Sequence, residues 1–313
     1  MKRFLIEILF FLLPLVIFAF TAEILLRNIP NDYRNKRIYL DEHAEEVEVL
    51  ALGLSHAFNG INPDYFSMKT YNAAYVSQSI DMDWQIIKKY DEHWKNLEFI
   101  LLPISYPTMF ERLETAPESW QIKNYVLYYK MNISNKIKDN SEILGNKLWY
   151  SMYRIMQYYV LKKSPLLSTD NGWRSRPSEE IDMEKDGKER ATLHTIDNPA
   201  CFQKNVEYLE TILEYAENHN ITVILYTPPA YKSYVENLNK KQLDETRNIA
   251  LLIVKEYQNV YYFDMLKDNS FLLSDYADSD HLNPSGAEKL SRKMNYIIFS
   301  IENERQIVSQ QGN

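Results

Sequence analysis

The sequence has little cysteine and little glycine, and it has no excess of positive charge. Its one cysteine, Cys201, excludes an internal disulfide framework and any metal site built from several cysteines. With only 7 glycines in 313 residues, the chain has no glycine-rich phosphate loop and no dinucleotide fingerprint. The formal net charge of −8 argues against a nucleic-acid partner, because binding a phosphate backbone needs a basic surface. We therefore expect no nucleic-acid partner and no cofactor.

The histidines give no metal-binding pattern either. None of the 6 is spaced from another as in the His-x-x-x-His pairs of helical metal sites, so no bound metal is expected. What the chain does have is 45% hydrophobic and 25% charged residues. This composition is typical of one large globular domain or two small ones.

One long apolar run differs from this globular composition. Residues 4–22 are apolar apart from Glu7, and they follow the basic residues Lys2 and Arg3. As a helix, the run would be roughly 28 Å long, close to the thickness of a bilayer's hydrocarbon core. Basic flanks stay in the cytoplasm, so the rest of the chain is predicted to be extracytoplasmic. A cleaved signal peptide is the alternative, but the run is longer than a typical signal core and no clear cleavage site follows. Residues 1–27 are therefore predicted to be an uncleaved, single-pass anchor in the cell membrane.

Short apolar runs alternate with helical patterns after a polar connector at residues 28–45. Continuous runs of this kind are typical of strands that are buried on both faces of a parallel sheet. Strands are expected at residues 47–53, 99–104, 222–226 and 260–263, with a weaker candidate at 71–75. Helices are expected at residues 84–94, 205–218, 240–257 and 284–300. The alternation predicts an α/β domain in which helices cover both faces of a central parallel sheet.

The stretch 108–200 interrupts this alternation. It is too long for a loop and rich in Tyr, Trp and Met, and residues 164–187 within it are polar and loop-like. We predict a helical insertion whose aromatic side chains pack within the protein. Residues 303–313 are expected to form a polar C-terminal tail.

Ser55 is the first candidate for chemistry, in the sequence Gly53-Leu54-Ser55-His56 at the end of the first predicted strand. A serine at this strand-to-helix turn would be exposed at the carboxyl edge of the sheet, where open α/β sheets collect their chemistry. The position suits a nucleophile whose attack builds an oxyanion beside backbone N–H groups. A capping serine after a strand is the structural alternative.

The second candidate lies far along the chain, in Asp278-Ser279-Asp280-His281-Leu282-Asn283-Pro284. The histidine offers a general base, and carboxylates one and three residues before it offer a group to orient the imidazole. A serine hydroxyl needs such a base, because almost no alkoxide is present at neutral pH. A surface loop that ends in a capped helix is the alternative, since Asn-Pro predicts that as well.

Together, the Gly-x-Ser and Asp-x-x-His segments resemble those of the SGNH/GDSL hydrolase superfamily, over residues 46–302. With the anchor added, the chain is similar to membrane-bound members such as the D-alanyl transfer protein of teichoic acids and the alginate O-acetylation proteins. The resemblance implies a flavodoxin-like three-layer sandwich. It also implies that Ser55 is the nucleophile, His281 the base and Asp278 the orienting carboxylate, with Asp280 as the neighbouring alternative.

The same resemblance implies an oxyanion hole in which a glycine and an asparagine are usual. Ser77 stands where the glycine is usual, and Ser105 falls near the position of the asparagine. A backbone N–H at Ser77 can still donate, whereas loss of an asparagine donor typically costs about 100 to 1,000-fold in rate. His56, directly after the nucleophile, is expected to have a structural or substrate-contacting role.

The resemblance leads to one favoured function and two alternatives. The favoured function is a membrane-anchored, extracytoplasmic serine esterase or O-acyltransferase that acts on acyl esters of a cell-envelope polysaccharide. A transferase of this kind would depend on a multispanning membrane acyltransferase as a partner. The first alternative is a catalytically silent scaffold or glycan-binding module in a polymer-modification complex, and the second is a simple soluble lipase-like esterase.

Overall fold

The computed structural model describes residues 2–311, and the chain divides into two compact units. The α1 unit consists of Met1–Ile38 and Pro117–Leu167, and the sheet unit consists of Tyr39–Ala116 and Ser168–Asn313. Helix α2 (Asp32–His43) contains the first boundary between them. The chain therefore leaves the sheet unit after residue 116 and returns to it at residue 168.

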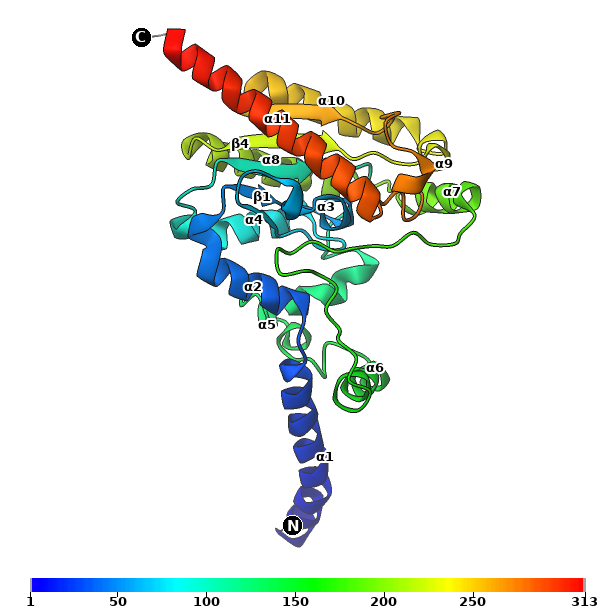
Figure 1. The fold of residues 1–313 in the computed structure, drawn as a ribbon. Helices are drawn as coiled ribbons and strands as arrows, with labels where there is room; N and C mark the ends of the chain where they lie inside the picture. Colours follow the sequence, from blue (N-terminus) through cyan, green and yellow to red (C-terminus); the bar gives the residue numbers. More distant parts are fainter. Residues whose placement is uncertain (1, 312–313) are drawn as a thin grey trace. The chain divides into compact units, whose positions relative to one another are not determined.

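The described part of the sheet unit contains five strands, all parallel, in the order β2-β1-β3-β4-β5 (Figure 1). Their bounds are β1 Val49–Ala51, β2 Thr70–Asn72, β3 Phe99–Pro103, β4 Thr222–Thr227 and β5 Val260–Asp264. This is the strand order of flavodoxin-like sheets, in which the order reverses between β1 and β3. The predicted α/β fold is confirmed.

Helices of the sheet unit begin where the sequence supplies caps. The carboxylate of Asp182 accepts from two backbone N–H groups of α7, and Asn198 caps α8 just before a proline. The α-helices that lie wholly in this unit are α3 Ser55–Gly60, α4 Ile80–Lys89, α7 Met183–Leu193, α8 Pro199–Asn218, α9 Lys232–Glu236, α10 Lys240–Glu256 and α11 Pro284–Gln311. Short 3₁₀ segments are η1 Ala44–Glu46, η2 Pro63–Tyr65, η3 Asp91–His93 and η7 Leu273–Asp275.

Strands β1 and β3, at the centre of the sheet, are apolar along their whole length because helices pack on both faces of the sheet. Ala51 and Leu101, which pair in register, share a buried core with Phe58 of α3 and Leu290 of α11. Residues that alternate with them, such as Leu50, point to the opposite face. On that face α8 packs against β4 and against α4. Because helices cover the two faces of the sheet, a site can form in the loops at the carboxyl ends of the strands.

The α1 unit takes its name from its long first helix, α1 (Lys2–Asn28). Within the described residues, Ile6–Asn28 is the one segment long and apolar enough to cross a membrane. Residues 10–20 are all exposed, whereas Leu26 is fully buried, so only the last turns of α1 pack into the unit. The other helical segments are η4 Pro117–Gln121, α5 Ile122–Leu127, η5 Ile137–Asn140, α6 Leu148–Ile155 and the π-helical turn η6 Met156–Val160.

Three segments differ from their predicted form. The connector 28–45 is mostly helix α2, and a lysine at one of its fully buried positions, Lys36, conceals the helical pattern in the sequence. The insertion 108–200 is divided, because Pro117–Leu167 belongs to the α1 unit whereas residues from Ser168 onward belong to the sheet unit. Residues 303–311 of the predicted tail continue α11, and the last two residues of that tail lie outside the described residues.

Candidate active site

Ser55 is placed by a sharp turn between β1 and α3. After β1 ends at Ala51, Gly53 takes a φ of 100°, in the left-handed region that favours glycine. A Cβ at Gly53 would lie 2.6 Å from ring carbons of Pro103 in β3, so a larger residue does not fit. Ser55 then begins α3 at the carboxyl end of the sheet, next to the point where the strand order reverses.

The side chains of Ser55, His281 and Asp278 form one hydrogen-bonded chain. Ser55 Oγ is 2.8 Å from His281 Nε2, and His281 Nδ1 is 2.9 Å from Asp278 Oδ1. These distances suit a nucleophile, its base and the group that orients the base. The structure thus brings together a serine and a histidine that are 226 positions apart, together with the predicted carboxylate. Their catalytic roles stay predictions.

The loop that carries Asp278 and His281 is held by its own hydrogen bonds. The backbone N–H of His281 donates to Asp278 Oδ1 at 2.8 Å, and its carbonyl accepts from the N–H of Ala277. Asn283 accepts from the N–H of Gly286 at the start of α11 and donates to a backbone carbonyl within the loop. The imidazole is therefore mounted on a loop whose conformation is fixed before any substrate binds.

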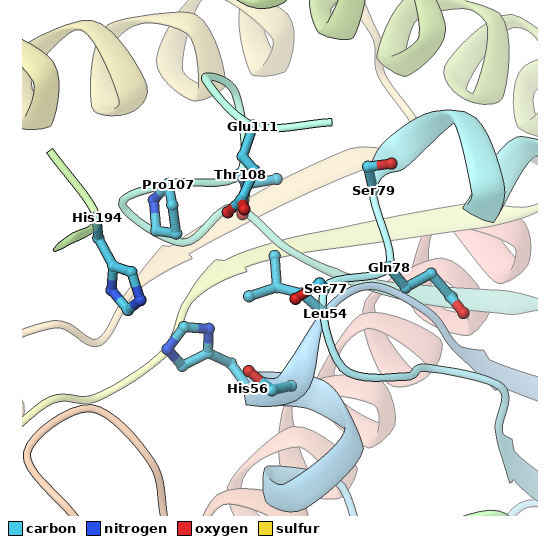
Figure 2. A pocket seen from close by; sticks show the side chains of 10 residues that line it. Leu54, His56, Ser77, Gln78, Ser79, Pro107, Thr108, Glu111 and His194 are labelled. Atoms are coloured by element: carbon cyan, nitrogen blue, oxygen red, sulfur yellow. The ribbon is translucent and has the colours of Figure 1, made fainter. Parts of the chain in front are cut away.

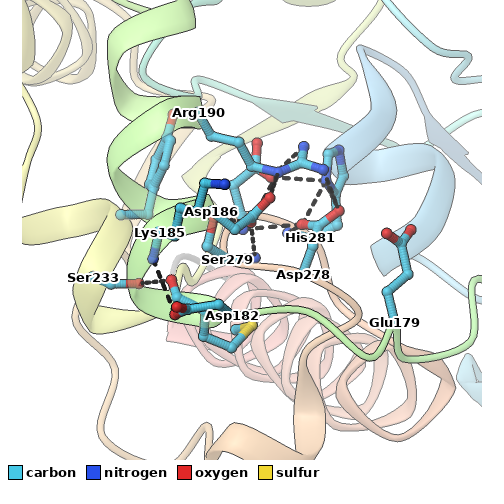
Figure 3. Close-up of polar contacts among 12 residues, drawn as sticks. Glu179, Asp182, Lys185, Asp186, Arg190, Ser233, Asp278, Ser279 and His281 are labelled. Carbon is cyan, nitrogen blue, oxygen red and sulfur yellow. Dashed lines mark hydrogen bonds and ion pairs between the residues drawn. The ribbon is translucent and has the colours of Figure 1, made fainter.

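Two arginines surround the carboxylate of Asp278, which is fully buried. Arg176 Nη2 lies 2.5 Å and Arg190 Nη2 2.9 Å from Asp278 Oδ2. Figure 3 shows Arg190 reaching from its helix to this carboxylate beside His281. The two guanidinium groups offset the cost of burying this carboxylate, whose Oδ1 accepts the hydrogen bond from the N–H at His281 Nδ1.

Arg190 lies on α7, and sequence reasoning missed its part in the site. Asp186, one turn earlier, accepts from the N–H of Ser279 at 3.0 Å and from its hydroxyl at 2.5 Å, which fixes α7 to the loop of the base (Figure 3). A Cβ at Gly187 would come within 2.6 Å of the backbone of Tyr234, so glycine is required for α7 to pack on α9. The spacing of four residues between Asp186 and Arg190 is the only local pattern in this polar segment, and it indicates an ion pair along one helix face.

Asp280 is a second buried carboxylate against the same imidazole. Its Oδ1 is 2.9 Å from His281 Nδ1 and 3.0 Å from Arg190 Nη1. Neither contact has hydrogen-bond geometry, and within residues 2–311 neither oxygen of Asp280 has a hydrogen-bond partner. The directed hydrogen bond of His281 therefore goes to Asp278, and Asp280 acts on the ring through its charge.

These two carboxylates change the acidity of the base. Burial alone lowers the pKa of His281, but Asp280 and Asp278 outweigh burial and raise this pKa to about 9. Burial raises the pKa of Asp280, but the charge on His281 holds it well below its ordinary value. At neutral pH the imidazole is therefore mostly protonated, and the fraction that can accept a proton from Ser55 grows as the pH rises towards 9.

Two further histidines contact the Asp280 carboxylate. The ring of His56 stacks on His281 with centroids 5.0 Å apart, and its Nε2 is 3.5 Å from Asp280 Oδ2. His194 Nδ1 is 3.6 Å from the same oxygen and 2.9 Å from the hydroxyl of Tyr234. Burial lowers the pKa of both rings, that of His194 to about 4. The pKa values of these two rings are therefore shifted in the opposite direction from that of His281.

A small pocket of about 60 Å³ opens at Ser55 (Figure 2). Its walls come from the start of α3, the loop before α4 and the loop after β3. The lining residues are Leu54, Ser55, His56, Ser77, Gln78, Ser79, Pro107, Thr108, Glu111 and His194. This space is suited to a small group next to the serine hydroxyl, and Thr108, Glu111 and His194 in its wall are residues that no sequence pattern indicated.

The predicted oxyanion residues Ser77 and Ser105 lie in different places. Ser77 lines the pocket with a φ of 54°, and within the described chain its backbone N–H has no hydrogen-bond partner. That N–H is available to an oxyanion. Ser105 instead lines a neighbouring cavity with Asp280, and its N–H donates to Thr108 Oγ1 at 2.9 Å. The structure brings Ser77 but not Ser105 to the Ser55 pocket, because the turn after β3 uses the Ser105 amide internally.

A metal ion would fit poorly among these groups. His56, Asp280 and His281 do bring possible ligand atoms within 4.8 Å of one another. However, the guanidinium of Arg190 already neutralises Asp280, and His281 Nδ1 is bonded to Asp278. A cation would therefore compete with the guanidinium of Arg190 for Asp280, and the cluster is better explained as the charge environment of the His281 imidazole. The absence of a metal stays a prediction.

The chain resembles solved structures at low identity. One, from Streptococcus pneumonia and provisionally described as a platelet activating factor, is 10% identical with a TM-score of 0.42, over 92% of this chain and 98% of its own. Another, provisionally described as an acylhydrolase from Bacteroides fragilis, is 11% identical with a TM-score of 0.40, over 85% of this chain and 95% of its own. No curated protein matches the sequence. A family described as "protein of unknown function (DUF1574)" matches residues 58–294, and the chain belongs to this family.

Proposed function

We propose that this protein is a membrane-anchored, extracytoplasmic serine esterase or O-acyltransferase of the SGNH/GDSL type, acting on acyl esters of a cell-envelope polysaccharide. One observation carries the proposal: Ser55 Oγ is 2.8 Å from His281 Nε2, and His281 Nδ1 is 2.9 Å from the buried Asp278. An imidazole that is oriented in this way is what a serine hydroxyl requires to become a nucleophile.

In the first half-reaction, Ser55 Oγ attacks the acyl carbonyl carbon while His281 Nε2 takes the hydroxyl proton. The negative charge that develops on the carbonyl oxygen is stabilised by the N–H of Ser77 and by the N–H of Ser55 at the start of α3. His281 then gives the proton to the leaving alcohol, and an ester of Ser55 remains. Asp278 stabilises the imidazolium while it carries that proton.

The second half-reaction decides between hydrolysis and transfer. His281 takes a proton from water or from a sugar hydroxyl as that oxygen attacks the acyl-Ser55 ester. Collapse of the tetrahedral species returns the proton to Ser55 Oγ and releases a carboxylic acid or a new sugar ester. The pocket of about 60 Å³ favours a small acyl group.

Helix α1 supports the membrane part of the proposal. Ile6–Asn28 is long and apolar enough to span a bilayer, and the side chains of residues 10–20 are exposed. An anchor of this kind keeps an enzyme near a membrane-bound polymer. It also keeps the enzyme near a multispanning membrane acyltransferase, the partner that would supply acyl groups from across the membrane.

Labelling with a serine-directed fluorophosphonate tests the proposal on the full-length protein in detergent. Wild type is compared with Ser55→Ala, with His281→Ala and with Ser270→Ala, which alters an exposed serine elsewhere in the sheet unit. We expect labelling of the wild type and of Ser270→Ala, and none of the other two. A wild type that is folded by circular dichroism but stays unlabelled from pH 7 to 9.5 would refute the enzymatic proposal.

A catalytically silent scaffold or glycan-binding module is the second candidate. The position of Ser105 favours it, because this residue stands near the position of the usual asparagine donor but does not line the Ser55 pocket. The two candidates differ in cells that carry Ser55→Ala. Acylation of the envelope polymer is lost if the protein is an enzyme, and it is unchanged if the protein is a scaffold.

A further inference from the structure

Helix α6 and the π-helical turn η6 that continues it expose apolar side chains along one face. Trp149, Tyr153, Met156 and Val160 follow one another at intervals of four, three and four residues, which is the spacing of a single helix face. Their exposed fractions are 67%, 50%, 51% and 67%. We call these four side chains the apolar face of α6.

The polar residues of the same helix point into the α1 unit. Ser151 is fully buried, and Arg154 Nη1 is 2.7 Å from the buried carboxylate of Glu142. Helices on the surface of water-soluble proteins have the opposite arrangement, with apolar residues inside and charges outside. A contiguous apolar face of this kind marks a surface that associates with something apolar.

The apolar face belongs to the same compact unit as α1, at the end of the apolar segment of that helix. Helix α6 packs on α1, and the hydroxyl of Tyr159 in η6 donates to the carbonyl of Leu25 at 3.0 Å. Glu23 accepts from the N–H groups of Glu142 and Ile143, each at 3.0 Å, so the same turn of α1 also holds the segment before α6. Helix α6 therefore lies at the level at which a membrane-spanning α1 would leave the hydrocarbon core.

Basic side chains stand at both ends of the apolar face. Lys147 precedes α6, and Lys162 and Lys163 follow η6, and all three are exposed. Tryptophan, tyrosine and lysine together are typical of the lipid headgroup region, where the rings lie at the interface and the ammonium groups reach phosphates. A groove on a partner protein would also cover apolar side chains, but the lysines and the continuity with α1 match a phospholipid surface.

We propose that α6 and η6 form an interfacial helix, whose apolar face lies in the boundary between headgroups and acyl chains of the bilayer that α1 spans. This inference rests on the membrane anchoring proposed above. It also corrects an expectation, since Tyr125 and Tyr129 are buried as predicted for the insertion, whereas Trp149 and Tyr153 are not. A second attachment beside the spanning helix would prevent the α1 unit from rotating freely about the axis of α1.

Quenching of a site-specific fluorophore by brominated lipids tests the inference on the full-length protein. In a Cys201→Ser background, single cysteines carry an NBD label, and the protein is placed in phosphatidylcholine nanodiscs that contain lipids brominated near the headgroup. Trp149→Cys and Met156→Cys report on the apolar face of α6. Val16→Cys in α1 serves as the lipid reference, and Lys188→Cys on the exposed side of α7 serves as the water reference.

We expect labels at positions 149 and 156 to be quenched by brominated lipid and protected from aqueous iodide, and the label at position 188 to behave in the opposite way. Lipid quenching at position 16 without quenching at 149 and 156 would overturn the interfacial helix and leave the anchor intact. If the label at position 16 is not quenched either, α1 does not anchor the protein in the membrane, and the inference of an interfacial helix is then wrong as well.

A matched pair of variants makes the test specific to the apolar face. With the label at position 149, Met156→Asp should reduce lipid quenching, because it puts a charge into the apolar boundary, while Met156→Leu should leave it unchanged. Met156 is 51% exposed, so neither change removes a core contact. Equal quenching in both variants would contradict the inference.

Discussion

Each unit contains a cluster of buried charges, and the two clusters differ in how completely their atoms are hydrogen-bonded. In the α1 unit, the carboxylate of Glu142 accepts from Lys123 Nζ at 2.9 Å and from Arg154 Nη1 at 2.7 Å, and its other oxygen accepts from a tyrosine hydroxyl. In the sheet unit, Asp280 lies near Arg190 and three imidazoles, but within the described chain neither of its oxygens has a hydrogen bond.

On the proposed function, this difference separates a cluster that stabilises the α1 unit from one that adjusts the pKa of a catalytic base. Burial raises the pKa of Glu142, but Lys123 and Arg154 outweigh burial and lower it to about 2, so this carboxylate is ionised at neutral pH. Asp280 instead acts directly on the protonation of the imidazole beside Ser55. Among the described residues, hydrogen bonds are thus missing at the carboxylate whose charge raises the pKa of His281.

The largest expected effect comes from Asp278→Asn in the sheet unit. An asparagine that donates to His281 Nδ1 stabilises the wrong tautomer of the imidazole, and a loss of about 10⁴-fold in kcat is expected by analogy with serine hydrolases. Hydrolysis of p-nitrophenyl acetate measures it, with Asp170→Asn, an exposed residue of the same unit, as the control. A folded Asp278→Asn protein with the wild-type rate would show that Asp278 does not orient the base.

The next effect belongs to the α1 unit. Glu142→Gln leaves the buried Lys123 without its anionic partner, and we expect the free energy of unfolding to fall by about 3 to 5 kcal/mol. Chemical denaturation of the full-length protein measures this fall, with Glu118→Gln in the same unit as the control. The rate of fluorophosphonate labelling per folded molecule should not change. A large change in that rate would mean that the two clusters are not independent.

The contribution of the Glu142 cluster to stability depends on pH within a defined range. Because the pKa of Glu142 is about 2 when folded and ordinarily about 4.5, its contribution to stability is fully present above about pH 4.5 and is lost as the pH falls towards 2. The difference in stability between wild type and Glu142→Gln should therefore shrink across this window. A difference that stays constant down to pH 2 would show that folding does not lower the pKa of Glu142.

The smallest effect is a shift in a pH profile caused by Asp280→Asn. Removing this charge lowers the raised pKa of His281, so the rise of the labelling rate with pH should move from about pH 9 to lower pH. At pH 7 the rate should increase about tenfold for each unit by which the pKa falls. The profile of Asp170→Asn should match that of the wild type. An unmoved profile in Asp280→Asn would assign the raised pKa to Asp278 alone.

The sheet was predictable from the sequence because the strands other than β5 are buried along their whole length. The apolar runs at residues 99–104 and 222–226 correspond to β3 and β4, and even the weaker run at 71–75 overlaps β2. The Asp-x-x-His motif was recognisable for a local reason as well. Its spacing of three residues allows one carboxylate to accept from both the backbone N–H and the Nδ1 of His281.

The rest of the site was not predictable, because it depends on contacts between distant segments. Nothing local in the polar sequence of α7 indicates that Arg190 pairs with Asp278, far later in the chain. Ser105 has the expected place in the order of strands and loops, but the turn that follows uses its amide for Thr108. Likewise, Lys36 becomes buried only when the unit is folded. In the sequence alone, its charge makes the α2 segment look like a polar connector.

On the proposed function, the separation of 226 positions between Ser55 and His281 couples activation of the nucleophile to folding of the sheet unit. A chain that has formed β1 and the turn at Gly53 holds a serine in place, but that serine has no base. The base reaches it only when the segment after β5 closes over the sheet and α7 supplies Arg190 to the loop. On the proposed function, partly folded chains carry an inert hydroxyl, and reactivity towards acyl groups reports that these distant segments of the sheet unit have come together.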